Sequence, residues 1–157
     1  MRPESFREIA LYVWERQLNQ PYRWGGDDPL AGFDCSGLVL EGLKAAGVLP
    51  RDGDWNAETL LRGVFRTLPR LTDPRGILPG CLVFYNRGMP ARVGHVEIVW
   101  AVVGGRVFTI GASGGGPAET SLEAAARDNA YVKIRPAVLG WVACVDPFGG
   151  VIGAPIV

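Results

Sequence analysis

The sequence carries no net charge, because 16 lysines and arginines balance 16 aspartates and glutamates. A nucleic-acid-binding domain normally has a basic surplus that neutralises phosphates, so we expect no nucleic-acid partner. No apolar run is long enough to cross a bilayer, and we expect no stable membrane insertion. The first eight residues, MRPESFRE, lack the apolar core of a signal peptide. We therefore expect synthesis in a cytoplasm without an export signal.

Cysteine and histidine are both scarce. Three cysteines lie far apart, at positions 35, 81 and 144, and His95 is the only histidine. The odd number and the wide spacing match no disulfide framework and no zinc knuckle. A zinc site built from these four residues stays open as a weak alternative, because such sites usually contain a close pair of ligands. We expect no metal and no organic cofactor.

Apolar residues make up 48% of the 157 residues, which is enough for one domain with a sizeable core. We predict a single domain over residues 1–157, with residues 149–157 as a loose tail or one that packs on a neighbour. The 22 glycines and 12 prolines predict many tight turns between short elements.

The predicted helices precede the predicted strands. Apolar spacing predicts helices over residues 4–19, 34–46 and 57–68, and a short one over 121–129. Strands are predicted over 81–85, 95–103, 106–110, 131–134 and 141–145, with a two-residue turn at 104–105. This order predicts an α+β fold in which the N-terminal helices pack on an antiparallel sheet.

Cys35 is placed where a polar loop meets the second predicted helix. Free N–H groups and the positive end of the helix dipole would favour its thiolate, which is the nucleophilic form. The alternative is a buried structural cysteine, as most free cysteines are.

His95 opens a predicted strand in the later half of the chain. A nucleophilic cysteine needs a base within hydrogen-bond reach, and spatial neighbourhood matters more than sequence distance. His95 is the one imidazole that can serve as this base. The alternative is a histidine that only satisfies its own hydrogen bonds in the fold.

Four blocks of sequence resemble the NlpC-type cell-wall cysteine peptidases, which are compact papain-like domains. The blocks occur in the family's order over about residues 5–115. They are PYRWGG (21–26), FDCSGLV (33–39), LPG with LVFY (78–80 and 82–85), and GHV with Ile98 (94–98).

The resemblance implies that Cys35 attacks an amide carbonyl in a peptidoglycan stem peptide. His95 would hold a thiolate–imidazolium pair and protonate the leaving amine. Tyr22 matches a tyrosine that lines the site, and Asp34 and Ser36 match positions that shape the substrate pocket. Local packing is the alternative for Tyr22, and helix capping is the alternative for Asp34 and Ser36.

One position departs from the family pattern. Members often carry a third polar residue, commonly histidine, just before Ala-Ser in the return strand, where this chain has Gly111. Glu97 is a replacement candidate, because residues 95 and 97 share one face of a strand. Alternatives are an ion pair of Glu97 with an arginine, or orientation of His95 by water, a carbonyl, Thr109 or Ser113.

We expect a peptidoglycan endopeptidase or amidase, from a phage lysin or tail-associated hydrolase or from an exported toxin. The alternatives are an acyltransferase or deamidase with another substrate, and a non-catalytic module that binds stem peptides. Arg87 and Arg92 are interpreted as solvated loop charges, with a grip on a substrate carboxylate as the alternative. We interpret Cys81 and Cys144 as core residues. Neither the oligomeric state nor the bond that is cut follows from the sequence.

Overall fold

The computed structural model describes residues 3–88 and 90–149, and its first half is mainly helical. Helix α1 spans Pro3–Glu15, and helix α2 spans Cys35–Ala45. A single helical turn, α3 (Ala57–Thr59), continues into the π-helical segment η1 (Leu60–Val64). A 3₁₀ turn, η2 (Pro74–Gly76), precedes the sheet.

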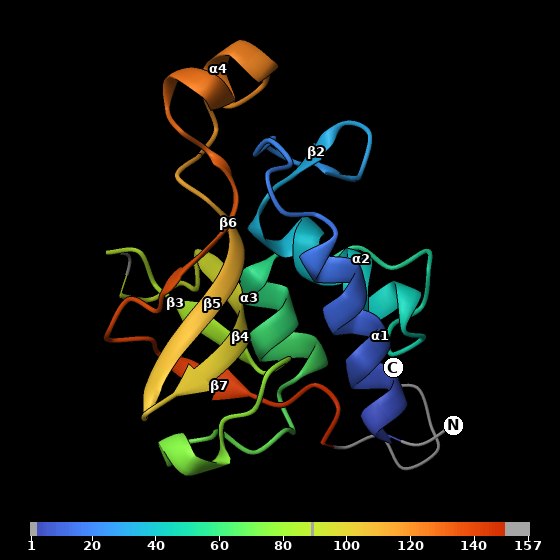
Figure 1. The fold of residues 1–157 in the computed structure, drawn as a ribbon, viewed down its shortest axis with the longest axis vertical. Helices are drawn as coiled ribbons and strands as arrows, with labels where there is room; N and C mark the ends of the chain where they lie inside the picture. The colour runs from blue at the N-terminus through green and yellow to red at the C-terminus, as the bar shows by residue number, and fades with distance from the viewer. Residues whose placement is uncertain (1–2, 89, 150–157) are drawn as a thin grey trace.

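The second half forms one five-stranded antiparallel sheet. Its strands are β3 (Leu82–Tyr85), β4 (His95–Val103), β5 (Arg106–Ser113), β6 (Tyr131–Pro136) and β7 (Ala143–Val145). They are ordered β6-β5-β4-β3-β7, and helix α4 (Leu122–Arg127) lies between β5 and β6 in the chain. Figure 1 shows α1 and α2 beside this sheet, with α4 projecting from one end. The predicted α+β class and the antiparallel sheet are confirmed.

Three predicted boundaries are wrong. Helix α1 ends at Glu15 instead of residue 19, because the following chain pairs with the start of β6, where Pro21 bridges Tyr131. The predicted helix over 57–68 ends at residue 64, where Arg70 donates to the carbonyl of Phe65. The predicted loop 19–32 contains a small hairpin, β1 (Asp27–Asp28) with β2 (Gly32–Phe33).

The two faces of the sheet pack differently. The face toward α1 and α2 carries buried side chains that include Phe84, Val96, Ile98 and Ile110. The opposite face carries Cys81, Val83, Tyr85, Val99 and Cys144, covered by the segment around Ala137 and Trp141. Since His95 and Glu97 pair with Tyr85 and Val83 across the β3–β4 ladder, their side chains belong to this second face. Both cysteines are buried, which confirms their assignment to the core.

Helix α2 lies close against α1 at Gly42. A Cβ atom added there would lie 2.3 Å from the Trp14 ring, so only glycine lets the buried indole fit. The indole N–H of Trp14 donates to the Leu38 carbonyl at 2.9 Å. This contact fixes the axis of α2 and therefore the direction in which its first residue points.

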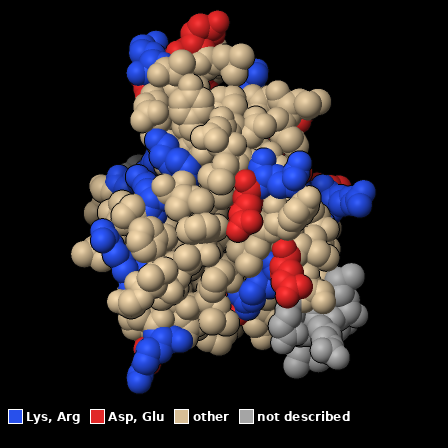
Figure 2. All heavy atoms as spheres, in the orientation of Figure 1, with Lys and Arg blue, Asp and Glu red and all other residues tan. Residues whose placement is uncertain are grey.

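The remaining predicted elements are present, although β5 extends to Ser113 and β7 begins only at Ala143. Gly104 and Gly105 both have positive φ, as the predicted β4–β5 turn requires. The face of the molecule in Figure 2 shows acidic and basic side chains interspersed, in line with the zero net charge. None of the described helices is long and apolar enough to cross a membrane. Most of the predicted loose tail, residues 150–157, lies outside the described residues.

Candidate active site

Cys35 is the first residue of α2, and the loop before it is pressed against the helix start. The Asp34 carboxylate caps the helix by accepting from the Gly37 N–H at 2.7 Å, and it also accepts from the Gly25 N–H at 3.1 Å. A Cβ atom at Gly37 would lie 2.0 Å from the Gly26 carbonyl oxygen. Glycine at position 37 therefore allows the approach that holds Cys35 in place.

A cleft of about 480 Å³ opens over Cys35. Tyr22, Trp24, Asp34 and Arg87 are among the residues that line it, and we call it the Cys35 cleft. The backbone N–H of Val96, the second residue of β4, lies near enough to the Cys35 sulfur to lower the pKa of the thiol. Helix α2 and strand β4 therefore meet at this sulfur, next to His95.

His95 is buried, with 2% of its surface exposed. Its Nε2 atom lies 3.0 Å from Oε1 of Glu97, two residues further along β4. Its other ring nitrogen, Nδ1, is buried and has no hydrogen-bond partner among the described residues. One side of the ring is thus held by a carboxylate, while the other side is available.

The Glu97 carboxylate is completely buried and receives two further hydrogen bonds. The Thr109 hydroxyl donates to Oε2 at 2.6 Å, and Nη2 of Arg135 donates to Oε1 at 2.5 Å. Three groups from β4, β5 and β6 therefore surround one carboxylate and satisfy it.

Gly111 provides the space for this carboxylate. The β4–β5 register pairs Ile98 with Ile110, which puts Glu97 opposite Gly111. A Cβ atom at position 111 would lie 2.7 Å from Cγ of Glu97. A side chain at position 111 would exclude the observed conformation of Glu97. The buried carboxylate of Glu97 therefore requires glycine at position 111.

The charges in this cluster favour an ionised Glu97 and a neutral His95. Burial opposes the charged form of Glu97, but the hydrogen bonds from His95 and Thr109 and the positive charge of Arg135 outweigh it and lower the pKa to about 2. Burial lowers the pKa of His95 below its ordinary value, although the hydrogen bond that the ring donates to Glu97 counteracts part of this effect.

The thiol differs from the sequence-based expectation. Burial, followed by the negative charge of Asp34, raises the pKa of Cys35 to about 11. The backbone N–H of Val96, the positive charge of Arg87 and the N–H of Ser36 counteract this only in part. The expected stabilisation of a thiolate by the helix start is therefore overridden, and the free site favours a neutral thiol beside a neutral imidazole.

The other predicted site residues lie around Cys35. Tyr22 is buried, lines the Cys35 cleft and packs against the backbone of Gly115. Burial and the nearby Cys35 raise the pKa of its hydroxyl. Asp34 and Ser36 also line the cleft. Asp34 is the helix cap, so the capping alternative is confirmed for Asp34. Ser36 lies inside the helix and its hydroxyl donates to Asp34 at 3.3 Å, so Ser36 is not a cap, and a substrate role stays a prediction for both residues.

Two residues at the cleft were not predicted to be functional. Trp24 has no assigned function within the PYRWGG block, yet 53% of its surface is exposed and it lines the Cys35 cleft. Arg87 was interpreted as a solvated loop charge, but its charge lowers the pKa of both Cys35 and His95. Only the fold brings the Arg87 loop to this site, and no local pattern around either residue indicates it.

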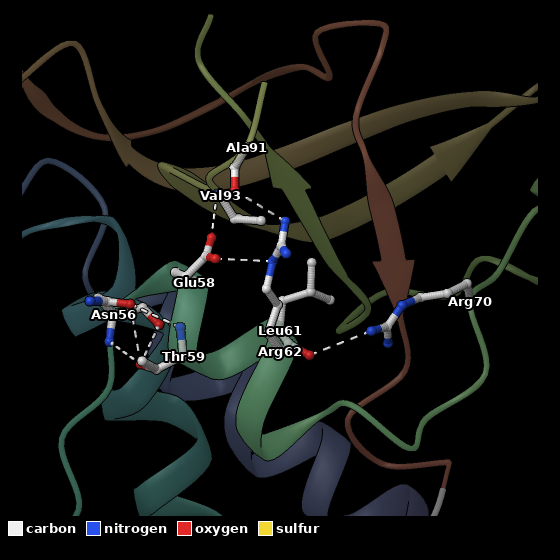
Figure 3. A network of polar contacts seen from close by, with 8 residues as sticks. All are labelled: Asn56, Glu58, Thr59, Leu61, Arg62, Arg70, Ala91 and Val93. Carbon is white, nitrogen blue, oxygen red and sulfur yellow. Dashed lines mark hydrogen bonds and ion pairs between the residues drawn. The ribbon is translucent and has the colours of Figure 1, made fainter. Parts of the chain in front are cut away.

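A polar network fixes the loop that leads into His95. Figure 3 shows Glu58 of α3 accepting from the backbone N–H of Val93 and pairing with Arg62 at 3.0 Å. Arg62 also donates to the Ala91 carbonyl at 3.4 Å. Asn56 and Thr59 cap the helical turn reciprocally. The wall of the Cys35 cleft formed by residues 92–94 is therefore anchored to α3.

No cluster of three or more histidine, cysteine or acidic side chains suited to a metal ion occurs within residues 3–88 and 90–149. The alternative of a zinc site built from His95 and the three cysteines has no support in this part of the chain.

Comparison with protein families gives one match, the model described as NlpC/P60 family, over residues 19–121. Among solved structures, the P60 domain of an antigen from M. avium subspecies paratuberculosis is 21% identical, with a TM-score of 0.64, covering 93% of this chain and 97% of that one. The peptidoglycan hydrolase RipB from Mycobacterium tuberculosis is 22% identical, with a TM-score of 0.60, covering 91% and 65%. These likenesses establish the predicted papain-like fold.

Curated relatives match over shorter segments. The murein DD-endopeptidase MepH of Escherichia coli is 49% identical over 37 residues, which are 24% of this chain and 14% of that protein. The bifunctional muramidase/DL-endopeptidase CwlT of Bacillus subtilis is 61% identical over 48 residues, which are 30% and 15%. The matched segments thus span about one seventh of each relative's length.

Proposed function

Because this chain belongs to the NlpC/P60 family, we propose that it is a cysteine hydrolase that cuts amide bonds in peptidoglycan stem peptides. The observation that carries this proposal is the arrangement around His95. Nε2 of His95 is held by the buried carboxylate of Glu97, and Nδ1 has no hydrogen-bond partner among the described residues. Val96, the next residue of β4, lies beside the Cys35 sulfur. A cysteine nucleophile requires an oriented base of this kind.

In the proposed reaction, Cys35 Sγ attacks the amide carbonyl while its proton passes to Nδ1 of His95. The carbonyl oxygen becomes an oxyanion, and free N–H groups at the start of α2 stabilise it. The imidazolium then gives the proton to the leaving amine, the C–N bond breaks and a thioester remains on Cys35. Water, activated by His95, hydrolyses this thioester and restores the thiol.

Glu97 acts as the third member of the site by orienting His95 and stabilising the imidazolium that forms. Its low pKa supports this role, because it stays charged while the proton moves between sulfur, imidazole and amine. Because Nε2 of His95 is hydrogen-bonded to Glu97, Nδ1 is the ring nitrogen that exchanges the proton with Cys35 and the leaving amine. Arg135 and Thr109 hold the carboxylate in position.

Digestion of purified peptidoglycan tests this function. We expect new soluble stem-peptide fragments by mass spectrometry from the wild type, none from Cys35→Ala or His95→Ala, and slower release from Glu97→Gln. The mass of each fragment identifies the bond that is cut.

Two other results would redirect the proposal. Absence of fragments with a Cys35 that still reacts with a thiol probe indicates an acyltransferase or deamidase with another substrate. Absence of fragments with an unreactive Cys35 indicates a module that binds stem peptides.

A further inference from the structure

A second cavity, of about 250 Å³, is lined by His95 and does not include Cys35. Tyr85, Arg87, His95, Arg135 and the segment 138–140 line it, and we call it the His95 pocket. Arg87 lines both cavities, so they are neighbours. We propose that the His95 pocket binds a carboxylate of the amino-acid residue that leaves as the amine. This inference rests on the proposed hydrolase function.

Two buried polar groups in this pocket lack partners. The Tyr85 hydroxyl and Nε of Arg135 are both buried, and neither has a hydrogen-bond partner among the described residues. Buried donors without acceptors are rare and costly in folded proteins. A ligand that accepts hydrogen bonds from both would satisfy them.

The charge of the pocket selects an anion. Its described lining residues include two arginines, Arg87 and Arg135, and no carboxylate. Arg135 is paired with Glu97 behind the pocket, which balances one positive charge. The nearest polar contact of Arg87 is with the neutral Gly115 carbonyl at 3.4 Å. One positive charge is therefore left for a ligand, and an ammonium group would be repelled.

The chemistry decides which half of the substrate reaches this pocket. The acyl half is attached to Cys35 and occupies the Cys35 cleft. The amine half takes its proton from His95, so it lies on the His95 side. A carboxylate on the residue that carries this amine would then point toward Tyr85 and Arg135. The pocket is smaller than the 300–1,000 Å³ of a typical drug-sized site, which suits a single residue.

Binding of free amino acids to the wild type tests the proposal without any hydrolysis. The probes are meso-diaminopimelic acid and D-alanine, each compared with its amide, and the readout is the NMR signals of the His95 ring. We expect both acids to shift these signals and the amides to bind at least about tenfold more weakly.

Tyr85→Phe removes only the hydroxyl and should weaken acid binding about tenfold while leaving amide binding unchanged. Tyr12→Phe is the matched control, because Tyr12 is 61% exposed and far from the site in sequence, and it should change neither. A thermal melt of each variant verifies that it is folded. Equal binding of acids and amides, or full acid affinity in Tyr85→Phe, overturns the proposal.

The two proposals fail in different ways. Peptidoglycan fragments together with equal binding of acids and amides would refute the carboxylate pocket and leave the hydrolase standing. Selective acid binding without any fragments would refute the hydrolase and keep the pocket.

Discussion

At the scale of single residues, the protonation states of Cys35 and His95 depend on burial. Burial raises the pKa of the thiol to about 11 and lowers the pKa of the imidazole, and both shifts favour the neutral forms. The positive end of one helix does not offset them, and Asp34, which caps that helix, adds a negative charge beside the thiol. In the proposed reaction we therefore expect His95 to remove the thiol proton during the attack, without a preformed thiolate.

This assignment predicts the pH dependence of thiol alkylation. The rate of reaction of Cys35 with iodoacetamide should be low at pH 6–7 and should rise continuously up to about pH 10, because only the thiolate reacts and its pKa is about 11. The measurement is the rate of mass increase, with Cys35→Ala as the blank for the buried Cys81 and Cys144. A fast plateau between pH 5 and pH 8 would contradict it and indicate a thiolate–imidazolium pair.

At the scale of elements, the site depends on how strand β4 and the loop before it are held. The carboxylate of Glu58 accepts from the Val93 N–H, and Arg62 contacts both Glu58 and the Ala91 carbonyl. The strand start is thereby tied to α3, and α3 lines the same cleft as Cys35 through Ala57 and Glu58. The distance from base to nucleophile therefore depends on this contact as well as on the sheet.

Glu58→Gln should loosen the loop 91–94 because it weakens a charge-assisted hydrogen bond and removes the ion pair with Arg62. We expect faster hydrogen exchange of the Val93 amide and a several-fold lower kcat on peptidoglycan, with little change in the unfolding midpoint. Glu123→Gln is the control, since Glu123 occupies the first turn of α4 and is exposed. Unchanged exchange at Val93 would show that Glu58 does not anchor the loop.

At the scale of the whole molecule, stability is linked to the buried cluster on the second face of the sheet. Glu97 is fully buried, and its pKa falls from 4.5 to about 2 on folding. A carboxyl group with a depressed pKa stabilises the folded state above its ordinary value, and this contribution is lost as the pH falls toward the folded value. The corresponding free energy is on the order of 3 kcal/mol.

Glu97→Gln should therefore lower the free energy of unfolding near neutral pH by about 2 kcal/mol or more. The difference in free energy of unfolding between the variant and the wild type should decrease as the pH falls from about 5 to about 2. Denaturant unfolding at several pH values measures it. Glu8→Gln, at an exposed position of α1, is the control and should follow the wild type. A gap that stays constant with pH would mean that Glu97 is not the titrating group.

Much of the fold could be predicted from local pattern. The α+β class, helix α2 from Cys35, strands β3 and β4 and the Gly104–Gly105 turn follow from apolar spacing and turn chemistry, which act between near neighbours. The end of α1, the π-helical segment η1 and the β1–β2 hairpin were missed. Long-range pairing, such as that of Pro21 with Tyr131, decides them.

The chain by itself determined which chemistry is available, because it contains one histidine, one cysteine at a helix start and a glycine where relatives carry a side chain. Only the tertiary structure decided how these parts act. It placed Glu97 opposite Gly111, brought Arg135 from β6 to the same carboxylate and buried the thiol so that its pKa rises. Burial and cross-strand contacts are properties of the packed sheet, which joins residues as distant in the chain as Glu97 and Arg135, 38 positions apart.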